Sequence, residues 1–295
     1  MISVVQLGTV DYATGLKLQQ QLVALRKEDK IGDVLLLLEH SPVITLGRNA
    51  KAANVVASRE LLAQRGVELF ECDRGGDVTF HGPGQIVGYP IFDLRGFCVG
   101  ADALVRPSES QTRRETAEGR HKHIGVVDFV RRLEDVLMRT CADFSIATKR
   151  IPGLTGVWTD PDLSFPNSLS FRAEDNDSQN RSLESRNLLL ADAATNSGPE
   201  SKLAAIGIHI SRFVTSHGFA LNVNPDLSFF DLIIPCGITT KPVTSMQKEL
   251  GRPLDLNAVA QSISRNFGVV FQSQILWVDT LDALLCGAGA PAGIP

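Results

Sequence analysis

The chain has 295 residues, with 29 lysines and arginines against 33 aspartates and glutamates, and a net charge of −4. A nucleic-acid-binding protein is therefore not expected, because contacts with phosphates need a basic surface. The N-terminus lacks the basic and apolar regions of a signal peptide, and no window is apolar enough to cross a bilayer, so we expect a cytoplasmic protein without a membrane partner. We also expect it to be a monomer.

The first half of the chain is predicted to contain a helix and then mainly strands. Leu18, Leu22 and Leu25 repeat with the spacing of a helix. Apolar runs bounded by glycines and polar residues follow, and they indicate strands. The predicted strands are at residues 33–40, 41–47, 67–72, 77–80 and 85–92.

The second half begins with an amphipathic helix, on which Phe129, Leu133, Val136, Leu137 and Cys141 share one face, so Cys141 is expected in the core. Residues 202–210 and 213–223 are separated by two residues and predict an antiparallel hairpin. A helix at 254–268 with a glycine stop and a strand at 271–278 complete the pattern. Clustered strands predict an α+β fold, with one mixed, largely antiparallel sheet flanked by helices.

Two segments differ from the rest in composition. Residues 105–123 contain one valine and no aromatic residue, and residues 159–201 are rich in serine, asparagine and acidic residues. Neither can bury enough apolar surface to offset the entropy of ordering, so we expect both to be disordered surface insertions. The whole chain, residues 1–295, is then expected to form a single domain.

A glycine-rich stretch, DRGGDVTFHGPGQ at residues 73–85, is the densest local signal. Four glycines and a proline indicate special backbone conformations, and Arg74, Asp77, Thr79 and His81 add polar side chains. A simple hairpin turn is one interpretation. A phosphate-binding loop of the Walker type does not fit, since neither a Gly-Lys-Ser/Thr sequence nor a helix follows.

Five cysteines are scattered without a Cys-x-x-Cys pair, so neither a metal site nor a disulfide framework is expected. Cys236 lies between Pro235 and Gly237 at the end of an apolar run. A lone cysteine is usually a buried apolar residue, but this turn could present a nucleophile. A nucleophilic thiol needs a partner that produces the thiolate, and His81, His217 and Lys202 are the candidates.

Lys202 stands at the start of a predicted strand of small and apolar residues. It is either the solvated end of that strand or a partly desolvated cation beside Cys236. In the second case its ammonium favours the thiolate, and the side chain acts as general acid and base.

Several motifs, in order, resemble one family: LEHSPVITLGRNA, RGGDVTFHGPGQIVGYPIFDLR, IPGLTGVW, KLAAIGIHISRFVTSHGFALNV and DLIIPCGI. Together they are similar to the lipoate-protein octanoyltransferases of the biotin/lipoate protein ligase superfamily. The resemblance covers most of the chain outside the two insertions.

The resemblance implies transfer of an octanoyl group from octanoyl-acyl carrier protein to a lysine of lipoyl domains, in 2-oxoacid dehydrogenase complexes and the glycine cleavage H protein. It implies that Cys236 forms a thioester, that Lys202 stabilises its thiolate and moves protons, and that no ATP, metal or other cofactor takes part. The substrate-binding residues it implies are Arg74, Gly75, Gly76, Asp77, Val78, Thr79, Phe80, His81, Ala205, Ile206, Gly207, Gly218, Phe219 and Ala220.

Two positions depart from the family, which commonly has a small hydroxyl residue at Ala205 and a glutamine at Asp77. Three alternatives remain at this stage. An ATP-dependent lipoate or biotin ligase would share the fold, a cysteine hydrolase would pair Cys236 with His81, and a non-catalytic module would only bind lipoyl domains.

Overall fold

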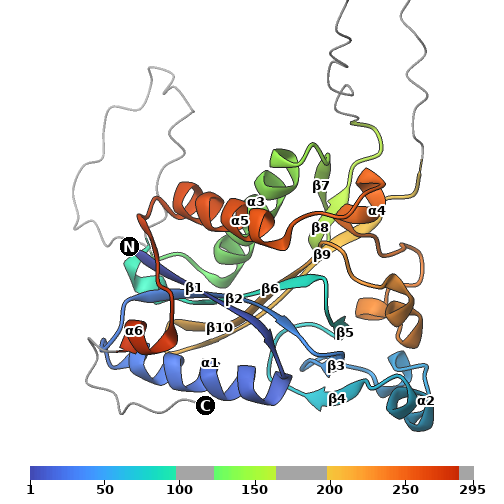
Figure 1. Ribbon diagram of the computed structural model, residues 1–295, viewed down its shortest axis with the longest axis horizontal. Helices are drawn as coiled ribbons and strands as arrows, with labels where there is room; N and C mark the ends of the chain where they lie inside the picture. Colours follow the sequence, from blue (N-terminus) through green and yellow to red (C-terminus); the bar gives the residue numbers. More distant parts are fainter. Residues whose placement is uncertain (98–122, 164–197, 286–295) are drawn as a thin grey trace, which may run out of the picture.

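The computed structural model describes residues 1–97, 123–163 and 198–285 (Figure 1). These residues form a large sheet with helices on both faces and a smaller sheet beside it. Most of the two expected insertions lies outside the described residues, so their disorder stays a prediction. None of the helices in the described ranges is long and apolar enough to span a membrane.

The large sheet is mixed and mostly antiparallel, as predicted. β11 (Ile275–Trp277) pairs with β1 (Ile2–Val10), and β1 with β2 (Asp33–His40), in parallel, whereas the other neighbours are antiparallel. β1 was not among the predicted strands, because most of its second half is not buried and lacks an apolar run. The order is β11 (Ile275–Trp277), β1 (Ile2–Val10), β2 (Asp33–His40), β6 (Gln85–Ile91), β10 (Val214–Asn222), β9 (Lys202–Ser211), β8 (Leu154–Thr159), β7 (Thr148–Ile151).

Three of the predicted strands form a separate small sheet, a division that the sequence pattern did not indicate. Its order is β4 (Glu68–Glu71), β3 (Val43–Leu46) and β5 (Val78–His81). Ile44, Val78 and Phe80 pack against the segment η3 (Leu227–Leu232) in a hydrophobic cluster of their own. The short elements η1 (Ala52–Asn54), α2 (Arg59–Gln64) and η4 (Pro235–Gly237) complete this part of the molecule.

Helices cover both faces of the large sheet (Figure 1). α3 (Val126–Asp143) and α5 (Leu256–Phe271) bury apolar side chains on one face, where Cys141 is fully buried as predicted. α1 (Tyr12–Lys27) packs on the other face through Leu18 and Leu22, and it begins at Asp11, whose carboxylate accepts a hydrogen bond from the Thr14 amide. The remaining elements are η2 (Leu94–Gly96), α4 (Met246–Leu250) and α6 (Leu281–Leu285).

The predicted hairpin is confirmed: β9 and β10 pair in antiparallel register from Ser211 and Val214 onward. Arg212 and Phe213 form its turn with φ angles of 51° and 68°. Two consecutive positive φ angles are typical of the type I′ turn, whose twist matches that of the strands.

The predicted glycine stop of the C-terminal helix is wrong. α5 runs through Gly268 to Phe271, and Gln272, with φ 51°, ends it. A Cβ atom on Gly268 would lie 3.0 Å from Cγ1 of Ile275 and 3.1 Å from the oxygen of Ser273. The glycine therefore lets the returning chain pack closely against the helix.

The ends of the second predicted insertion belong to the fold. Thr159 is the last residue of β8, and its amide donates to the Ser201 oxygen over 2.9 Å. The Ser201 amide donates back to Oγ1 of Thr159, also over 2.9 Å. The range 159–201 is thus too wide at both ends, although residues 164–197 lie outside the described part.

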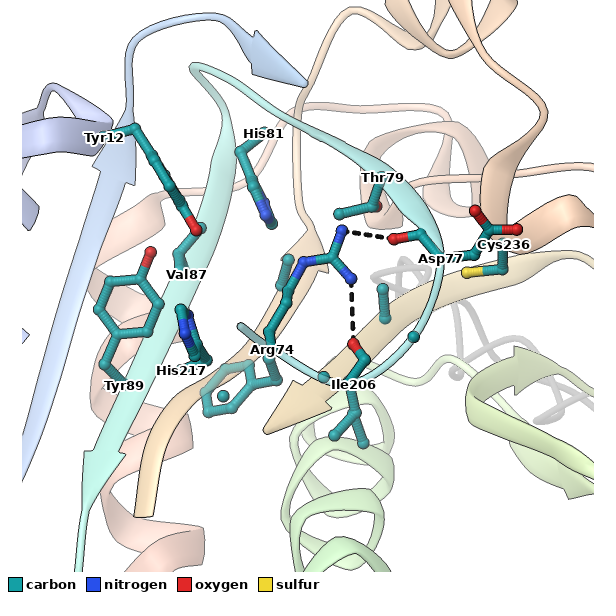
Figure 2. Close-up of a pocket in the computed structure, with 17 residues that line it drawn as sticks. Tyr12, Arg74, Asp77, Thr79, His81, Val87, Tyr89, Ile206, His217 and Cys236 are labelled. Atoms are coloured by element: carbon teal, nitrogen blue, oxygen red, sulfur yellow. Dashed lines mark hydrogen bonds between the residues drawn. The ribbon is translucent and has the colours of Figure 1, made fainter. Parts of the chain in front are cut away.

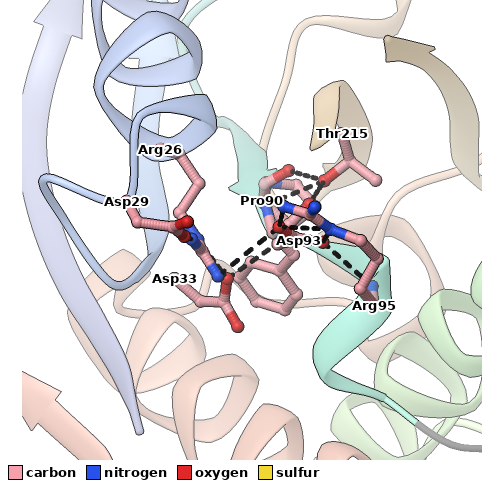
Figure 3. Close-up of polar contacts among 8 residues, drawn as sticks. Arg26, Asp29, Asp33, Pro90, Asp93, Arg95 and Thr215 are labelled. Atoms are coloured by element: carbon pink, nitrogen blue, oxygen red, sulfur yellow. Dashed lines mark hydrogen bonds and ion pairs between the residues drawn. The ribbon is translucent and has the colours of Figure 1, made fainter. Parts of the chain in front are cut away.

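A polar network joins α1, β2 and β10 at the end of β6 (Figure 3). Oδ1 of Asp33 accepts hydrogen bonds from Nε of Arg26 and from the Asp93 amide, both over 2.9 Å. Oγ1 of Thr215 donates to the Pro90 oxygen over 2.6 Å. These bonds satisfy polar groups where the strands leave the sheet and so hold its register.

Candidate active site

Cys236 and Lys202 are brought together by the fold. Nζ of Lys202 donates a hydrogen bond to Sγ of Cys236 over 3.1 Å. The lysine is the first residue of β9, and the cysteine lies in η4, so the pair joins the large sheet to the segment that packs on the small one. His81 and His217, the other candidate partners, have different contacts.

Lys202 is a buried cation, with 7% of its surface exposed. Its backbone is held by hydrogen bonds from its amide to the Pro242 oxygen and from the Thr244 amide to its own oxygen. Nζ also lies 5.2 Å from the centre of the Trp158 ring, on the neighbouring strand β8. The aromatic face attracts the ammonium, most strongly when water is excluded.

The turn that carries Cys236 is held in an unusual conformation. Cys236 and Gly237 have φ angles of 55° and 67°. A Cβ atom on Gly237 would lie 3.0 Å from Oδ2 of Asp77. Both the positive φ angle and this close approach therefore require a glycine. Asn54 fixes the turn, since its oxygen accepts from the Ile234 amide over 2.7 Å and its Nδ2 donates to Asp77 over 2.5 Å. A cysteine with positive φ often marks a functional position.

Arg74 organises the glycine-rich loop. Its side chain is buried and donates to Oγ1 and the backbone oxygen of Thr45, and to the backbone oxygens of Gly75 and Asp77. These bonds fasten the loop to β3. The loop also lies directly on the large sheet, because a Cβ atom on Gly207 would be 2.6 Å from the Gly75 oxygen. A side chain at residue 207 would therefore push the loop away.

A cavity lies between this loop and the large sheet, and its empty space of about 480 Å³ includes solvent at the open side (Figure 2). Cys236 is at one end, and Tyr12 and Tyr89 are at the other. Most of the predicted substrate-binding residues line it: Arg74, Gly75, Gly76, Asp77, Thr79, His81, Ala205, Ile206, Gly207, Gly218, Phe219 and Ala220.

Two predicted binding residues lie elsewhere, and two others turn their side chains away. Val78 and Phe80 alternate with the cavity residues of β5 and pack in the hydrophobic cluster beside η3. Ile206 and Phe219 belong to the core under the opposite face of the large sheet. Because strand side chains alternate between faces, Ile206 and Phe219 border the cavity chiefly with their backbone.

A second, smaller hollow adjoins the first. Thr79, Ala205 and Cys236 line both cavities, whereas Lys202 lines the second one. The sulfur of Cys236 therefore lies where two chambers meet, with the ammonium of Lys202 at the boundary.

Two buried histidines, His81 and His217, line the first cavity, and a third, His40, lies against Tyr12 and Tyr89. Burial lowers the pKa of His81 to about 3 and that of His40 to about 4. Burial also lowers the pKa of His217, although its Nε2 donates to Oδ1 of Asp73 over 2.7 Å. His81 donates from Nδ1 to Oε1 of Gln85 over 2.7 Å. All three rings are thus neutral near pH 7.

Asp77 and Ala205, the two departures from the family pattern, both lie in the site. Asp77 accepts hydrogen bonds from the amides of Lys51 and Val78 and from Asn54, so its carboxylate supports the turn of Cys236. Ala205 forms part of the cavity floor. In the parts of the chain that the structure describes, no three His, Cys, Asp or Glu side chains are placed to hold a metal ion.

The sequence did not indicate Tyr12, Val87, Tyr89, Trp158 or Asn54 as part of the site. Val87 and Tyr89 had a usable signal, because alternate residues of β6 must share one face. Tyr12 and Trp158 resemble ordinary core aromatics, since each is at most 2% exposed. Their place depends on long-range packing.

The chain matches the model of the lipoyl protein ligase A/B catalytic domain over residues 11–107 and 117–268. The octanoyltransferase of Koribacter versatilis is 52% identical over 285 residues, which are 97% of this chain and 90% of that protein. The octanoyltransferase of Acidobacterium capsulatum is 46% identical over 287 residues, 97% of this chain and 96% of that protein.

Solved structures share the fold at low sequence identity. A bipartite lipoate protein ligase from Thermoplasma acidophilum superimposes with a TM-score of 0.58 at 11% identity, covering 97% of this chain and 89% of its own. Lipoate-protein ligase A bound with ATP gives a TM-score of 0.55 at 10% identity, covering 98% and 93%. By its sequence matches over nearly its full length, the chain belongs to the lipoyl protein ligase A/B family and is an acyltransferase of the octanoyltransferase group.

Proposed function

We propose that this protein takes an octanoyl group from octanoyl-acyl carrier protein as a thioester on Cys236 and passes it to a lysine of a lipoyl domain. The observation that carries the proposal is the 3.1 Å contact between Nζ of Lys202 and Sγ of Cys236 at the end of a cavity. A buried ammonium beside a thiol stabilises the thiolate, which is the nucleophile.

In the first half-reaction, the Cys236 thiolate attacks the thioester carbonyl of the donor. The tetrahedral intermediate collapses, a thioester forms on Cys236, and the carrier's thiolate leaves. The Lys202 ammonium, hydrogen-bonded to the attacking sulfur, gives its proton to the leaving thiolate. Lys202 is then neutral. One thioester replaces another, so the step needs neither ATP nor a metal ion.

In the second half-reaction, the neutral amine of the acceptor lysine attacks the thioester on Cys236. An amide bond forms, the Cys236 thiolate leaves, and the neutral Lys202 takes the proton from the attacking nitrogen. The thiolate and ammonium pair is thereby restored. The two chambers at Cys236 support this sequence, since one can hold the acyl chain while Lys202 faces the other.

The acceptor is inferred from a protein with a similar structure. One similar structure is described together with its E2 lipoyl domain, and we propose the same class of acceptor here, including 2-oxoacid dehydrogenase complexes and the glycine cleavage H protein. Cys72, Cys141 and Cys236 are free thiols, which suits the reducing cytoplasm.

The experiment that tests the proposal is intact mass spectrometry after mixing the protein with octanoyl-acyl carrier protein, without ATP. We expect an octanoyl adduct that is absent in Cys236→Ser, forms slowly in Lys202→Ala and disappears when a lipoyl domain is added. An ATP requirement would support a ligase, and release of free octanoate in place of transfer would support a hydrolase. Full transfer activity in Cys236→Ser would disprove the thioester relay.

A further inference from the structure

The floor of the cavity is built from two rows of residues that cross three strands. In the first row, Ala205 of β9 pairs with Ala220 of β10, which pairs with Val87 of β6. Two residues along, Gly207 pairs with Gly218, and Tyr89 on β6 continues that row. The floor therefore consists of alanine and glycine on β9 and β10, and larger side chains appear at β6.

The two ends of the cavity differ. Cys236, at one end, shares the lining of both chambers with Ala205 and is partly exposed. Tyr12 and Tyr89, at the other end, are 2% and 4% exposed, so the cavity is closed there (Figure 2). An acyl chain on Cys236 would run along the small residues toward β6.

The distance across the floor matches eight carbons. Neighbouring strands lie about 4.8 Å apart, so β9 and β6, with β10 between them, are separated by roughly 10 Å. Carbon–carbon bonds of about 1.5 Å at near-tetrahedral angles give an extended eight-carbon chain a length of roughly 9 Å. A longer chain would meet the side chains on β6.

The end of the cavity is also rigid. Oη of Tyr89 donates to Nε2 of His40 over 2.5 Å, and Nδ1 of His40 donates to the Val10 oxygen over 2.7 Å. His40 is fully buried, and Tyr12 packs edge-on against it with ring centres 5.2 Å apart. Tyr89 is therefore anchored through β2 and cannot move aside without breaking buried hydrogen bonds.

We propose that Val87 and Tyr89, with Tyr12 behind them, form an end wall that sets the acyl chain length at eight carbons. This inference rests on the proposed function, because it takes Cys236 as the point of attachment. His40 acts as a positioning residue that holds Tyr89 in place.

The test compares donors with acyl chains of 6, 8, 10 and 12 carbons in single-turnover loading of Cys236, followed by intact mass. In Val87→Ala and Tyr89→Ala, the ratio of 10-carbon to 8-carbon loading should rise about tenfold, as two methylenes find space. In Ala220→Leu, the new side chain blocks the middle of the floor, so 6-carbon loading should exceed 8-carbon loading.

Val214→Ala is the matched control for Val87→Ala. Val214 is equally buried in the same cluster, on the neighbouring strand, but it does not line the cavity. It should leave the chain-length ratio unchanged. Tyr89→Phe keeps the ring but loses the hydrogen bond to His40, so its 10-carbon to 8-carbon ratio should rise, though less than in Tyr89→Ala.

Equal loss of loading at all chain lengths in the wall variants would overturn the end wall while leaving the thioester relay intact. If the wild-type protein formed no thioester with any donor, the relay would fail instead. Calorimetric titration with free fatty acids of the same lengths then tests the end-wall proposal. The proposal predicts that Val87→Ala and Tyr89→Ala bind the 10-carbon acid more tightly, relative to the 8-carbon acid, than the wild type does.

Discussion

The ammonium nitrogen of Lys202 lies 3.1 Å from the sulfur of Cys236, although 34 positions separate the two residues along the chain. The lysine opens a strand of the large sheet and the cysteine lies in a 3₁₀ turn, so neither local element creates the pair. The pair is created when the two sheets pack against each other.

Replacing Lys202 should slow both the activation of Cys236 and turnover. Lys202→Met keeps most of the side-chain volume but removes the charge, so the thiolate loses its stabilising partner. We expect alkylation of Cys236 by iodoacetamide at pH 7 to slow at least tenfold and octanoyl transfer to fall by about 10²–10⁴-fold.

Lys241→Met is the control for this variant. Lys241 also lies near Trp158, at 6.0 Å from its ring, but its ammonium is paired with Glu200. Its loss should leave the alkylation rate within a factor of two of the wild type. Equal effects of both substitutions would mean that general surface charge, and not the direct contact, activates the thiol.

The ring of Trp158 should affect how well the Lys202–Cys236 pair forms the thioester. Trp158→Leu removes the aromatic face under Nζ of Lys202, whereas Trp158→Phe keeps a weaker one. We expect thioester formation to slow roughly tenfold in the leucine variant and less in the phenylalanine variant. The comparison of the two variants separates this effect from simple loss of packing, since leucine and phenylalanine both fill part of the space but only phenylalanine keeps an aromatic face. Trp277→Leu, at an exposed site, should leave the rate of thioester formation unchanged.

Stability should fall in mild acid because of the buried histidines. Burial lowers the pKa of His81 to about 3 and that of His40 to about 4, against 6.5 in the unfolded chain. The unfolded state therefore binds more protons as the pH falls below 6.5, and the folded state loses stability until its own pKa is reached. Between pH 7 and 5, each histidine should cost about 2 kcal/mol of the free energy of unfolding.

Urea unfolding at pH 7, 6 and 5 measures this dependence. A variant with His40→Gln should show a shallower slope, while its stability at pH 7 is lower because the hydrogen bond to Tyr89 is altered. His123→Gln, at an exposed position, should keep the wild-type slope. An unchanged slope in the His40 variant would show that this ring does not titrate on unfolding in this range.

Arg74 should prove irreplaceable by lysine. Its guanidinium serves four acceptors in different directions, including the backbone oxygens of Thr45 and Asp77, and a single ammonium cannot reach them all. We expect Arg74→Lys to lower the free energy of unfolding by about 2–4 kcal/mol. The exposed Arg48→Lys should change it by less than about 0.5 kcal/mol. Equal small losses in the two variants would contradict the anchoring role.

Much of the fold could be predicted because local signals agreed with the final structure. β2 is an unbroken apolar run, and the helical face through Phe129 and Cys141 is buried as its spacing indicates. β1 could not be predicted from its sequence because it lacks a strong apolar pattern. Its pairing with β2 and β11 in the folded protein makes it a strand. The prediction that the helix ends at Gly268 was wrong for a similar reason. The role of this glycine depends on close packing against Ile275, a residue beyond the end of the helix.

The site was only partly predictable. Residues 74–81 and the β9–β10 hairpin carry motifs that point to the cavity, and most of them line it. The alternation of side chains on β5 and β9 decides which of them face it, and this excludes Val78 and Phe80. Tyr12 and Trp158 come from distant elements, and their aromatic side chains look like core residues until the packing is known.

The paired backbone at Thr159 and Ser201 has a consequence for how such proteins change over evolutionary time. Two hydrogen bonds close the chain on either side of residues 160–200, one position before Lys202. The entropy of closing a loop grows only slowly with its length, so segments inserted here can expand or shrink at little thermodynamic cost. Sequence drift in that stretch is thus insulated from the placement of the lysine.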